Sequence, residues 1–250
     1  MQYPNGLIID EAQNLPDLFS ALQVVVDENK DYRYILSGSS DFLLMQNISQ
    51  TLAGRVAVTR LLPLSISELK EDANIDTNTL MWKGFYPAVW GDGKNPDNVY
   101  DSYVSTYLQR DVRQILNIKD LSLFQKFLTI VASRVGNVFI ASSIASELGV
   151  DYKTIQSWMS ILETSYTAFL LQPFHRNIGK RLTKTPKIYF YDIGLVCHLL
   201  GIENEQHIKN HPLRGAIFEN MVVCEMLKRR YNKGLKSNLY FYRDQSAEVD

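Results

Sequence analysis

Two strand-then-helix units in the first fifty residues constrain the fold more than any other feature of this chain. The apolar run 7–9 ends in Asp10 and Glu11, and apolar residues then recur at helical spacing over 18–26. A second apolar run, 34–36, leads into serines and another helical start. Because parallel strands need a crossover connection, usually a helix, this order predicts a parallel α/β sheet.

The ends of these two strands carry polar side chains suited to phosphate chemistry: Asp10, Glu11, Ser37 and Ser39. In open parallel sheets, ligands bind at the carboxyl ends of the strands. There an aspartate can hold a magnesium ion, a neighbouring glutamate can orient or deprotonate an attacking water, and a serine can hydrogen-bond that water or the terminal phosphate. The alternative is that the acids only cap a strand and begin the next helix.

A helix-turn-helix pattern is predicted between residues 141 and 160, after an amphipathic linker helix over 100–115. Ala145 allows close packing of its two helices, Gly149 forms the turn, and Ile155 anchors the second helix. If residues 167–173 begin a wing, the pattern is a winged helix. Since the outward face of its second helix offers one lysine, we expect a protein contact there ahead of a DNA contact.

A basic segment follows this pattern and is the best candidate for binding nucleic acid. Five cations occur within twelve residues that contain no acid: Arg176, Lys180, Arg181, Lys184 and Lys187. The formal charge is −6 over residues 1–114 and +5 over the remainder, which also favours the second half as the part that meets a phosphate backbone. The alternative is a solvated basic loop.

Seven segments of the sequence occur in a recognisable order: LIIDEAQ at 7–13, LSGSS at 36–40, LAGRV at 52–56, LPLS at 62–65, GFYP at 84–87, YLQRDV at 107–112 and a block over 175–201. Together they resemble the AAA-type P-loop ATPases of bacteria and archaea that carry an uncharacterised C-terminal domain. Each segment is weakly specific alone, but their order and spacing extend over nearly the whole chain.

The resemblance implies ATP and Mg²⁺ as ligands of the full-length protein. It makes Asp10 and Glu11 the Walker B pair, with Asp10 positioning the metal and Glu11 activating water. It makes 37–39 the sensor strand, in which Ser37 or Ser39 senses the phosphate, and it lets Arg55 reach a γ-phosphate. The alternative for Arg55 is an ordinary surface residue. An oligomer is compatible with the family, although no feature of the sequence requires one.

No P-loop of the form Gly-x-x-x-x-Gly-Lys-Ser/Thr occurs in the sequence. The two Gly-Lys pairs, at 93–94 and 179–180, lack both the earlier glycine and the following hydroxyl residue. In the resembled family the P-loop precedes the Walker B strand, so we expect the sequence to be a fragment, cut at its start and also at its end within a hairpin. We predict that this polypeptide alone does not hydrolyse ATP.

The last fifty residues predict a helix that contains Glu219, a strand over 239–243, a turn, and a final strand ending at Asp250. A helix glutamate with a strand-tip aspartate holds Mg²⁺ in restriction-endonuclease-like folds, which the last domain of the resembled family is similar to. Such sites also need a Glu-x-Lys strand, which is absent here, so Glu219 is equally interpretable as a surface acid.

These patterns predict a multidomain protein of the α/β and α+β classes. We expect a partial ATPase core over 1–75, a helical linker over 76–120, a winged helix over 121–175, and a partial nuclease-like domain over 176–250. The leading function is an ATPase whose nucleotide state moves the later domains. The alternatives are a non-catalytic scaffold that binds nucleic acid or protein, and a metal-dependent nuclease.

Two further expectations concern the cell compartment and the cysteines. The sequence lacks an apolar run long enough for a membrane helix and lacks a secretory start, which predicts a cytoplasmic protein without a membrane partner. Cys197 and Cys224 are its two cysteines, and the lack of a CxxC pair or a partnering histidine spacing argues against a zinc finger or a disulfide framework. We expect both to be buried thiols.

Overall fold

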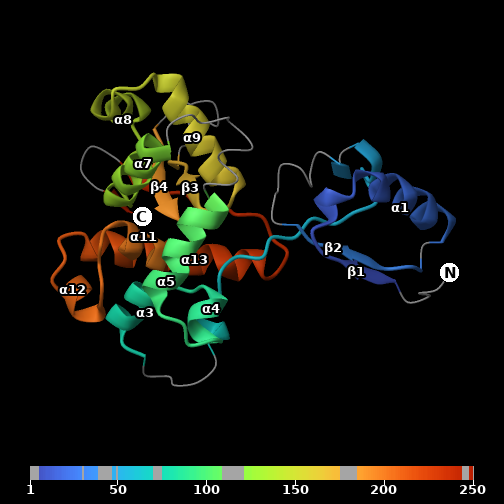
Figure 1. Cartoon of the computed structure of the whole chain (residues 1–250), viewed down its shortest axis with the longest axis horizontal. Coiled ribbons are helices and arrows are strands. Elements are labelled where there is room, and N and C mark those ends of the chain that lie inside the picture. Colours follow the sequence, from blue (N-terminus) through green and yellow to red (C-terminus); the bar gives the residue numbers. More distant parts are fainter. Residues whose placement is uncertain are drawn as a thin grey trace. The chain divides into compact units, whose positions relative to one another are not determined.

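The computed structural model of the chain describes residues 6–29, 31–38, 47–48, 50–69, 75–108, 121–174, 185–243 and 248–249, the last two and 107–108 by their backbone only. It divides into two compact units, Met1–Thr59 and Arg60–Asp250, here called the N-terminal and the C-terminal unit. Figure 1 shows both, and each is described by itself. The fold is mixed α/β, with many helices and small sheets.

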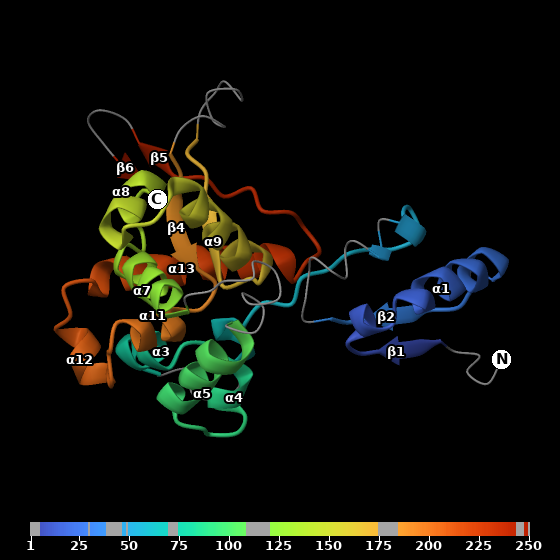
Figure 2. The ribbon, with the colours of Figure 1, turned by 45° about the horizontal axis from the view of Figure 1, so that its top comes forward.

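The N-terminal unit contains the predicted parallel strands. β1 (Leu7–Ile9) pairs with β2 (Tyr34–Leu36), and the connection runs through η1 (Ala12–Asn14) and α1 (Pro16–Glu28). The proline at the first position of α1 favours a helix start there because its fixed φ suits a helix and its missing N–H is not needed. Helix α1 covers one face of the strand pair (Figure 2), burying Phe19 and Leu22 against Ile48 and Leu52.

The C-terminal unit begins with η2 (Ile66–Glu68) and a group of short helices. These are α3 (Thr77–Lys83), α4 (Pro87–Trp90), α5 (Pro96–Ser102) and the π-helical turn η3 (Tyr103–Leu108). The prediction that a helix starts at Tyr100 was wrong by four residues, because the Asn95 side chain caps α5 and Pro96 occupies its first position. The later part of that predicted helix, 109–120, lies outside the described residues.

The predicted helix pair follows α7 (Leu121–Ser133). It consists of α8 (Ala141–Leu148) and α9 (Tyr152–Thr164), with Ala145 and Ile155 buried and Gly149 in the left-handed conformation that ends α8. Strands β3 (Ala168–Leu171) and β4 (Lys187–Phe190) then pair in antiparallel, and Val138 forms a further bridge to β4.

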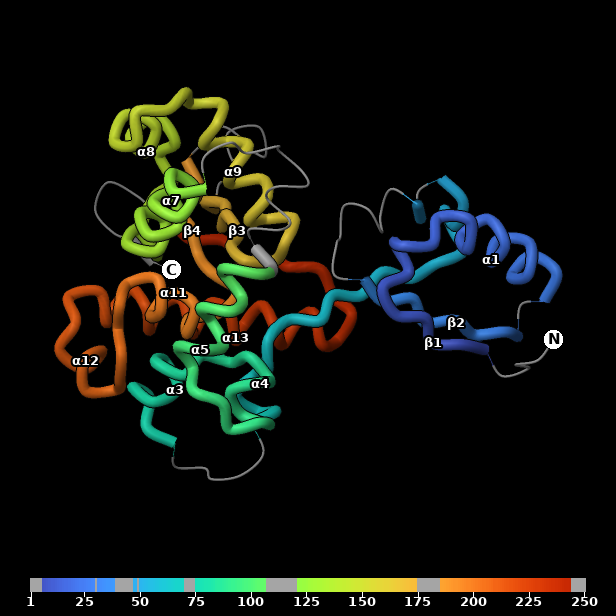
Figure 3. The backbone as a smooth tube through the Cα atoms, viewed as in Figure 1, coloured from blue at the N-terminus to red at the C-terminus, as the bar shows by residue number. Residues whose placement is uncertain are grey.

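The chain ends in α11 (Ile193–Leu199), α12 (Glu205–Lys209), α13 (Arg214–Tyr231) and the antiparallel pair β5 (Tyr242–Arg243) and β6 (Glu248–Val249). In Figure 3 the tube of α13 passes beside α11 and β4, which it contacts. One large core joins side chains of α7, α9, β4, α11 and α13. Both cysteines are buried, as predicted. None of the described helices is long and apolar enough to cross a bilayer.

Asp192 is buried in the C-terminal unit and bonds two of the recognised segments, 84–87 and 175–201, to each other. Its carboxylate is 2% exposed and accepts hydrogen bonds from the Tyr100 hydroxyl and the Phe85 N–H, both at 2.7 Å, and from the Leu195 N–H at 3.1 Å. A Cβ added at Gly194 would lie 2.3 Å from the Tyr100 hydroxyl oxygen. The segment 84–87 therefore packs directly on the segment 191–195.

Candidate functional site

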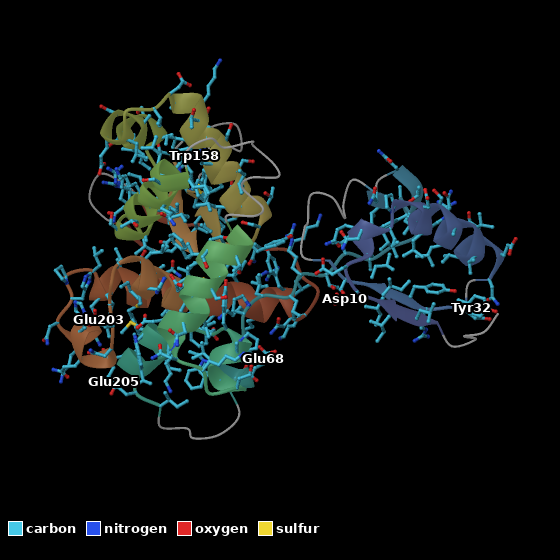
Figure 4. The ribbon with its side chains drawn as sticks, viewed as in Figure 1. Asp10, Tyr32, Glu68, Trp158, Glu203 and Glu205 are labelled. Carbon is cyan, nitrogen blue, oxygen red and sulfur yellow. The ribbon has the colours of Figure 1, made fainter. Side chains whose placement is uncertain are left out.

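The two strand tips of the N-terminal unit meet at Asp10 and Ser37. The Ser37 hydroxyl donates a hydrogen bond to Oδ1 of Asp10. Two backbone bonds fix this contact, because the Ser37 N–H donates to the Ile9 carbonyl at 2.9 Å and the Ala12 N–H donates to the Ser37 carbonyl at 3.0 Å. Both side chains are exposed, and Figure 4 labels Asp10 at the end of β1. The structure thus brings together two residues that are 27 positions apart in sequence.

Glu11 occupies an unusual backbone conformation at the same tip. Its φ of 51° and ψ of 40° are left-handed, a region that costs a residue with a Cβ about 1–2 kcal/mol. The Glu11 carboxylate is exposed and accepts a hydrogen bond from the Gln13 side-chain amide at 2.6 Å. Backbone strain of this kind concentrates at functional sites. The sequence pattern did not indicate this conformation.

The donor groups at this tip fit Mg²⁺. Mg²⁺ usually takes one or two carboxylates from the protein, and waters and substrate phosphates complete its octahedral shell. Asp10 supplies such a carboxylate beside a serine hydroxyl. Within the described ranges, no group of three His, Cys, Asp or Glu side chains forms a dedicated metal cage. Ser39, the other candidate on the second tip, lies outside the described residues.

Arg55 forms a two-bond ion pair with Asp27 of α1. Its Nε lies 2.6 Å from Oδ1 and its Nη2 2.9 Å from Oδ2 of that carboxylate, and these hydrogen bonds raise the pKa of Arg55. The same arginine lines a cavity of about 480 Å³ together with residues of β2 and the segment 56–59. Asp27 was not predicted from the sequence, because a partner 28 positions away leaves no local pattern.

Of the five cations in the segment predicted to bind nucleic acid, the structure describes one, Lys187. Arg176, Lys180, Arg181 and Lys184 lie outside the described residues. Lys187 is 3% exposed, and its Nζ lies 5.4 Å from the centre of the Phe241 ring. Our expectation of an exposed phosphate-binding cation is wrong for Lys187, because β4 is covered on both faces and buries all four of its residues.

Glu219, the predicted metal ligand of the nuclease-like part, points toward β4. Its Oε1 accepts a hydrogen bond from the Tyr189 hydroxyl at 2.5 Å and lies 3.8 Å from Nζ of Lys187. A buried lysine needs a compensating carboxylate, and these contacts supply one. Asp250 lies outside the described residues. The arrangement of Glu219 therefore has a structural explanation that needs no metal.

The segment that follows the N-terminal unit is attached to α13 by contacts that the sequence analysis missed. The Leu64 N–H donates to the Phe85 carbonyl at 2.9 Å, and Nζ of Lys228 donates to the Leu64 carbonyl at 2.7 Å. The Ile66 N–H donates to Oε2 of Glu225 at 2.9 Å. Lys228 is 1% exposed and also pairs with Glu225 at 2.9 Å. We call residues 61–69 the strap; Figure 4 labels Glu68, which lies within it.

Three family profiles match successive parts of the chain. The profile described as an AAA domain matches residues 1–70, a domain of unknown function (DUF8612) matches 74–206, and a second domain of unknown function (DUF4143) matches 214–250.

Several uncharacterized proteins are similar in sequence. Those of Mycobacterium tuberculosis and Mycobacterium bovis are each 32% identical over 98% of this chain and 55% of their own length. One from Methanocaldococcus jannaschii is 23% identical over 98% of this chain and 57% of its own length. The chain thus spans about half the length of the curated relatives it matches. No solved structure matches it.

Proposed function

We propose that this chain is part of an ATPase whose nucleotide state moves the later parts of the protein. The chain belongs to the family that carries the domain of unknown function DUF8612, and here an ATPase-like AAA domain precedes that domain. The AAA match includes both strand tips with Asp10, Glu11 and Ser37. The observation that carries the proposal is the hydrogen bond from Ser37 to Asp10, since it places both tips within reach of one ligand.

Each residue at the strand tips has a different proposed role in phosphate hydrolysis. Asp10 would hold a Mg²⁺ ion, which when bound neutralises charge on the phosphates. Glu11, on the exposed turn that follows, orients a water and accepts its proton. Ser37 has one hydroxyl hydrogen, which it donates to Asp10 in this structure, and it would donate that hydrogen to a phosphate oxygen once Asp10 holds the metal. Hydrolysis further needs a phosphate-binding loop, and no P-loop motif occurs in these 250 residues.

The proposed moving parts are a winged helix and the C-terminal region. The order of α7, α8 and α9, followed by the antiparallel β3–β4 pair with its bridge to Val138, supports the winged-helix proposal. Tyr152 and Gln156 on the exposed side of α9 bond to each other at 2.7 Å, and this side of the helix carries the single cation Lys153. A polar face with little charge favours a protein partner over DNA.

The experiment measures ATP turnover by the product of the complete reading frame that encodes this chain, and compares the wild type with two variants. We expect Mg²⁺-dependent hydrolysis that Glu11→Gln lowers by about 10²–10⁴-fold, the usual contribution of a general base, while ATP binding persists. Glu28→Gln, at the exposed end of α1, is the matched control and retains full turnover.

Unchanged turnover in Glu11→Gln would refute the assigned role. A product that neither binds nor hydrolyses ATP would support the scaffold alternative instead. Mg²⁺-dependent hydrolysis by the 250-residue chain alone would overturn the requirement for a P-loop. The contacts of Glu219 with Tyr189 and Lys187 favour a structural role, so we do not extend the proposal to a nuclease.

A further inference from the structure

Arg60, the first residue of the C-terminal unit, is held between two tyrosines from distant parts of that unit. Its Nε donates to the Tyr166 hydroxyl at 2.9 Å and its Nη1 to the Tyr231 hydroxyl at 3.3 Å. Its Cζ lies 5.7 Å and 5.4 Å from the centres of the two rings. Tyr166 forms the turn between α9 and β3, and Tyr231 is the last residue of α13. One guanidinium thus joins three segments of the chain.

Tyr166 adopts a backbone conformation that a tyrosine rarely takes. Its φ is 51°, and it and Glu11 are the two non-glycine residues with positive φ in the described part of the chain. Glycine or asparagine would occupy this turn at lower cost. Such a strained residue persists where the surrounding structure holds it in place. Here the Tyr166 ring packs edge-on against the Tyr191 ring, with 5.7 Å between the ring centres, and the Tyr166 hydroxyl accepts the hydrogen bond from Arg60.

Arg60 is also the first point at which the chain leaving the N-terminal unit is attached. Val58 before it is 51% exposed and Leu61 after it is 97% exposed. The next attachment is the backbone of Leu64, bonded to Phe85 and Lys228. Without the Arg60 contacts, Leu64 would be the first hydrogen-bonded residue after the N-terminal unit, so residues 60–63 could lengthen the connection by up to about 13 Å at 3.3 Å per residue.

We propose that Arg60 is a latch that fixes the hinge between the two units immediately before residue 60. With the latch closed, residues 60–63 are held to the C-terminal unit, and a displacement of the N-terminal unit reaches the α9–β3 turn and the end of α13. With the latch open, residues 60–63 absorb that displacement. The position of the hinge does not depend on the proposed function, whereas the transmission of a nucleotide signal rests on it.

The first test measures amide hydrogen exchange without nucleotide. We compare the wild type, Arg60→Ala, Tyr166→Phe and the matched control Arg229→Ala, an exposed arginine on α13. Exchange of the Leu64 amide, the first hydrogen-bonded N–H after Arg60, is expected to rise about tenfold in Arg60→Ala, less in Tyr166→Phe, which keeps the ring, and not in the control. Tryptophan fluorescence verifies that each variant is folded. Equal exchange of the Leu64 amide in Arg60→Ala and in the control would overturn the latch.

The second test adds ATP and Mg²⁺ to the product of the complete reading frame, with and without the Arg60→Ala change. We expect equal ATP affinity, with exchange changing at 164–168 and 228–231 in the wild type and not in the variant. The same response in both proteins would overturn the latch as the route of transmission. Absence of ATP binding in both would refute the proposed function, and the first test would then decide the latch alone.

Discussion

Replacing Asp192 with alanine removes a buried acceptor of the C-terminal unit. Tyr100 keeps an alternative acceptor, the Lys83 carbonyl at 2.9 Å, but the N–H groups of Phe85 and Leu195 lose their side-chain partner. Loss of the N-cap of α11 costs about 1 kcal/mol, and an unsatisfied buried N–H costs about 1–3 kcal/mol. Burial raises the pKa of Asp192, so removing the carboxylate returns part of its desolvation cost. We expect a net loss of about 2–3 kcal/mol.

The assay is urea unfolding followed by tryptophan fluorescence. All three tryptophans, Trp82, Trp90 and Trp158, belong to the C-terminal unit, so the signal reports this unit alone. The same fluorescence signal followed during heating should show a melting temperature lower by about 4–12 °C for a unit of this size. Asp97→Ala is the control, because its carboxylate is 44% exposed and lies 3.6 Å from the His198 ring, and it should change stability by less than about 0.5 kcal/mol.

The pH dependence of the same pair of proteins gives a second check. A carboxyl whose pKa is raised by folding contributes stability that is fully present below its unfolded pKa and is lost as the pH rises through the folded pKa. The stability difference between the wild type and Asp192→Ala should therefore be largest in acid and shrink toward neutral pH. A loss equal to that of the Asp97→Ala control, or a difference that grows with pH, would refute this account of the network.

Two further predictions concern buried positions of the C-terminal unit. Burial raises the pKa of the Cys224 thiol to about 12, so iodoacetamide at pH 8 should label it only after unfolding in urea; rapid labelling of the native protein would contradict the burial. Gly194→Ala should destabilise the unit by about 1–3 kcal/mol, because the new methyl group would overlap the Tyr100 hydroxyl at 2.3 Å. Its control is Gly215→Ala, because a Cβ added there would meet no neighbouring atom within 4 Å and alanine favours the helix. Equal melting temperatures for these two variants would argue against the clash.

The parallel order of β1 and β2 and the meeting of their tips followed from sequence, because both depend on local rules. A run of apolar residues, a helix start at a proline and a second run are enough to predict the crossover, and the crossover places both strand ends on one edge. Asp10 and Ser37 were brought together for that reason. The positions of α8, α9 and α13 were predictable for similar reasons, since helical spacing, caps and turn glycines act over a few residues.

The partners of the charged side chains were decided by the tertiary structure alone. Lys187 belongs to a basic run in sequence, yet β4 is covered on both faces and turns this lysine toward Glu219. Arg55 meets Asp27 and Arg60 meets two tyrosines across gaps of 28 to 171 residues. A count of charges along the sequence does not predict such contacts. Local backbone preferences are encoded within a few residues, whereas the burial and pairing of a charge depend on which distant surfaces the packed core brings against it.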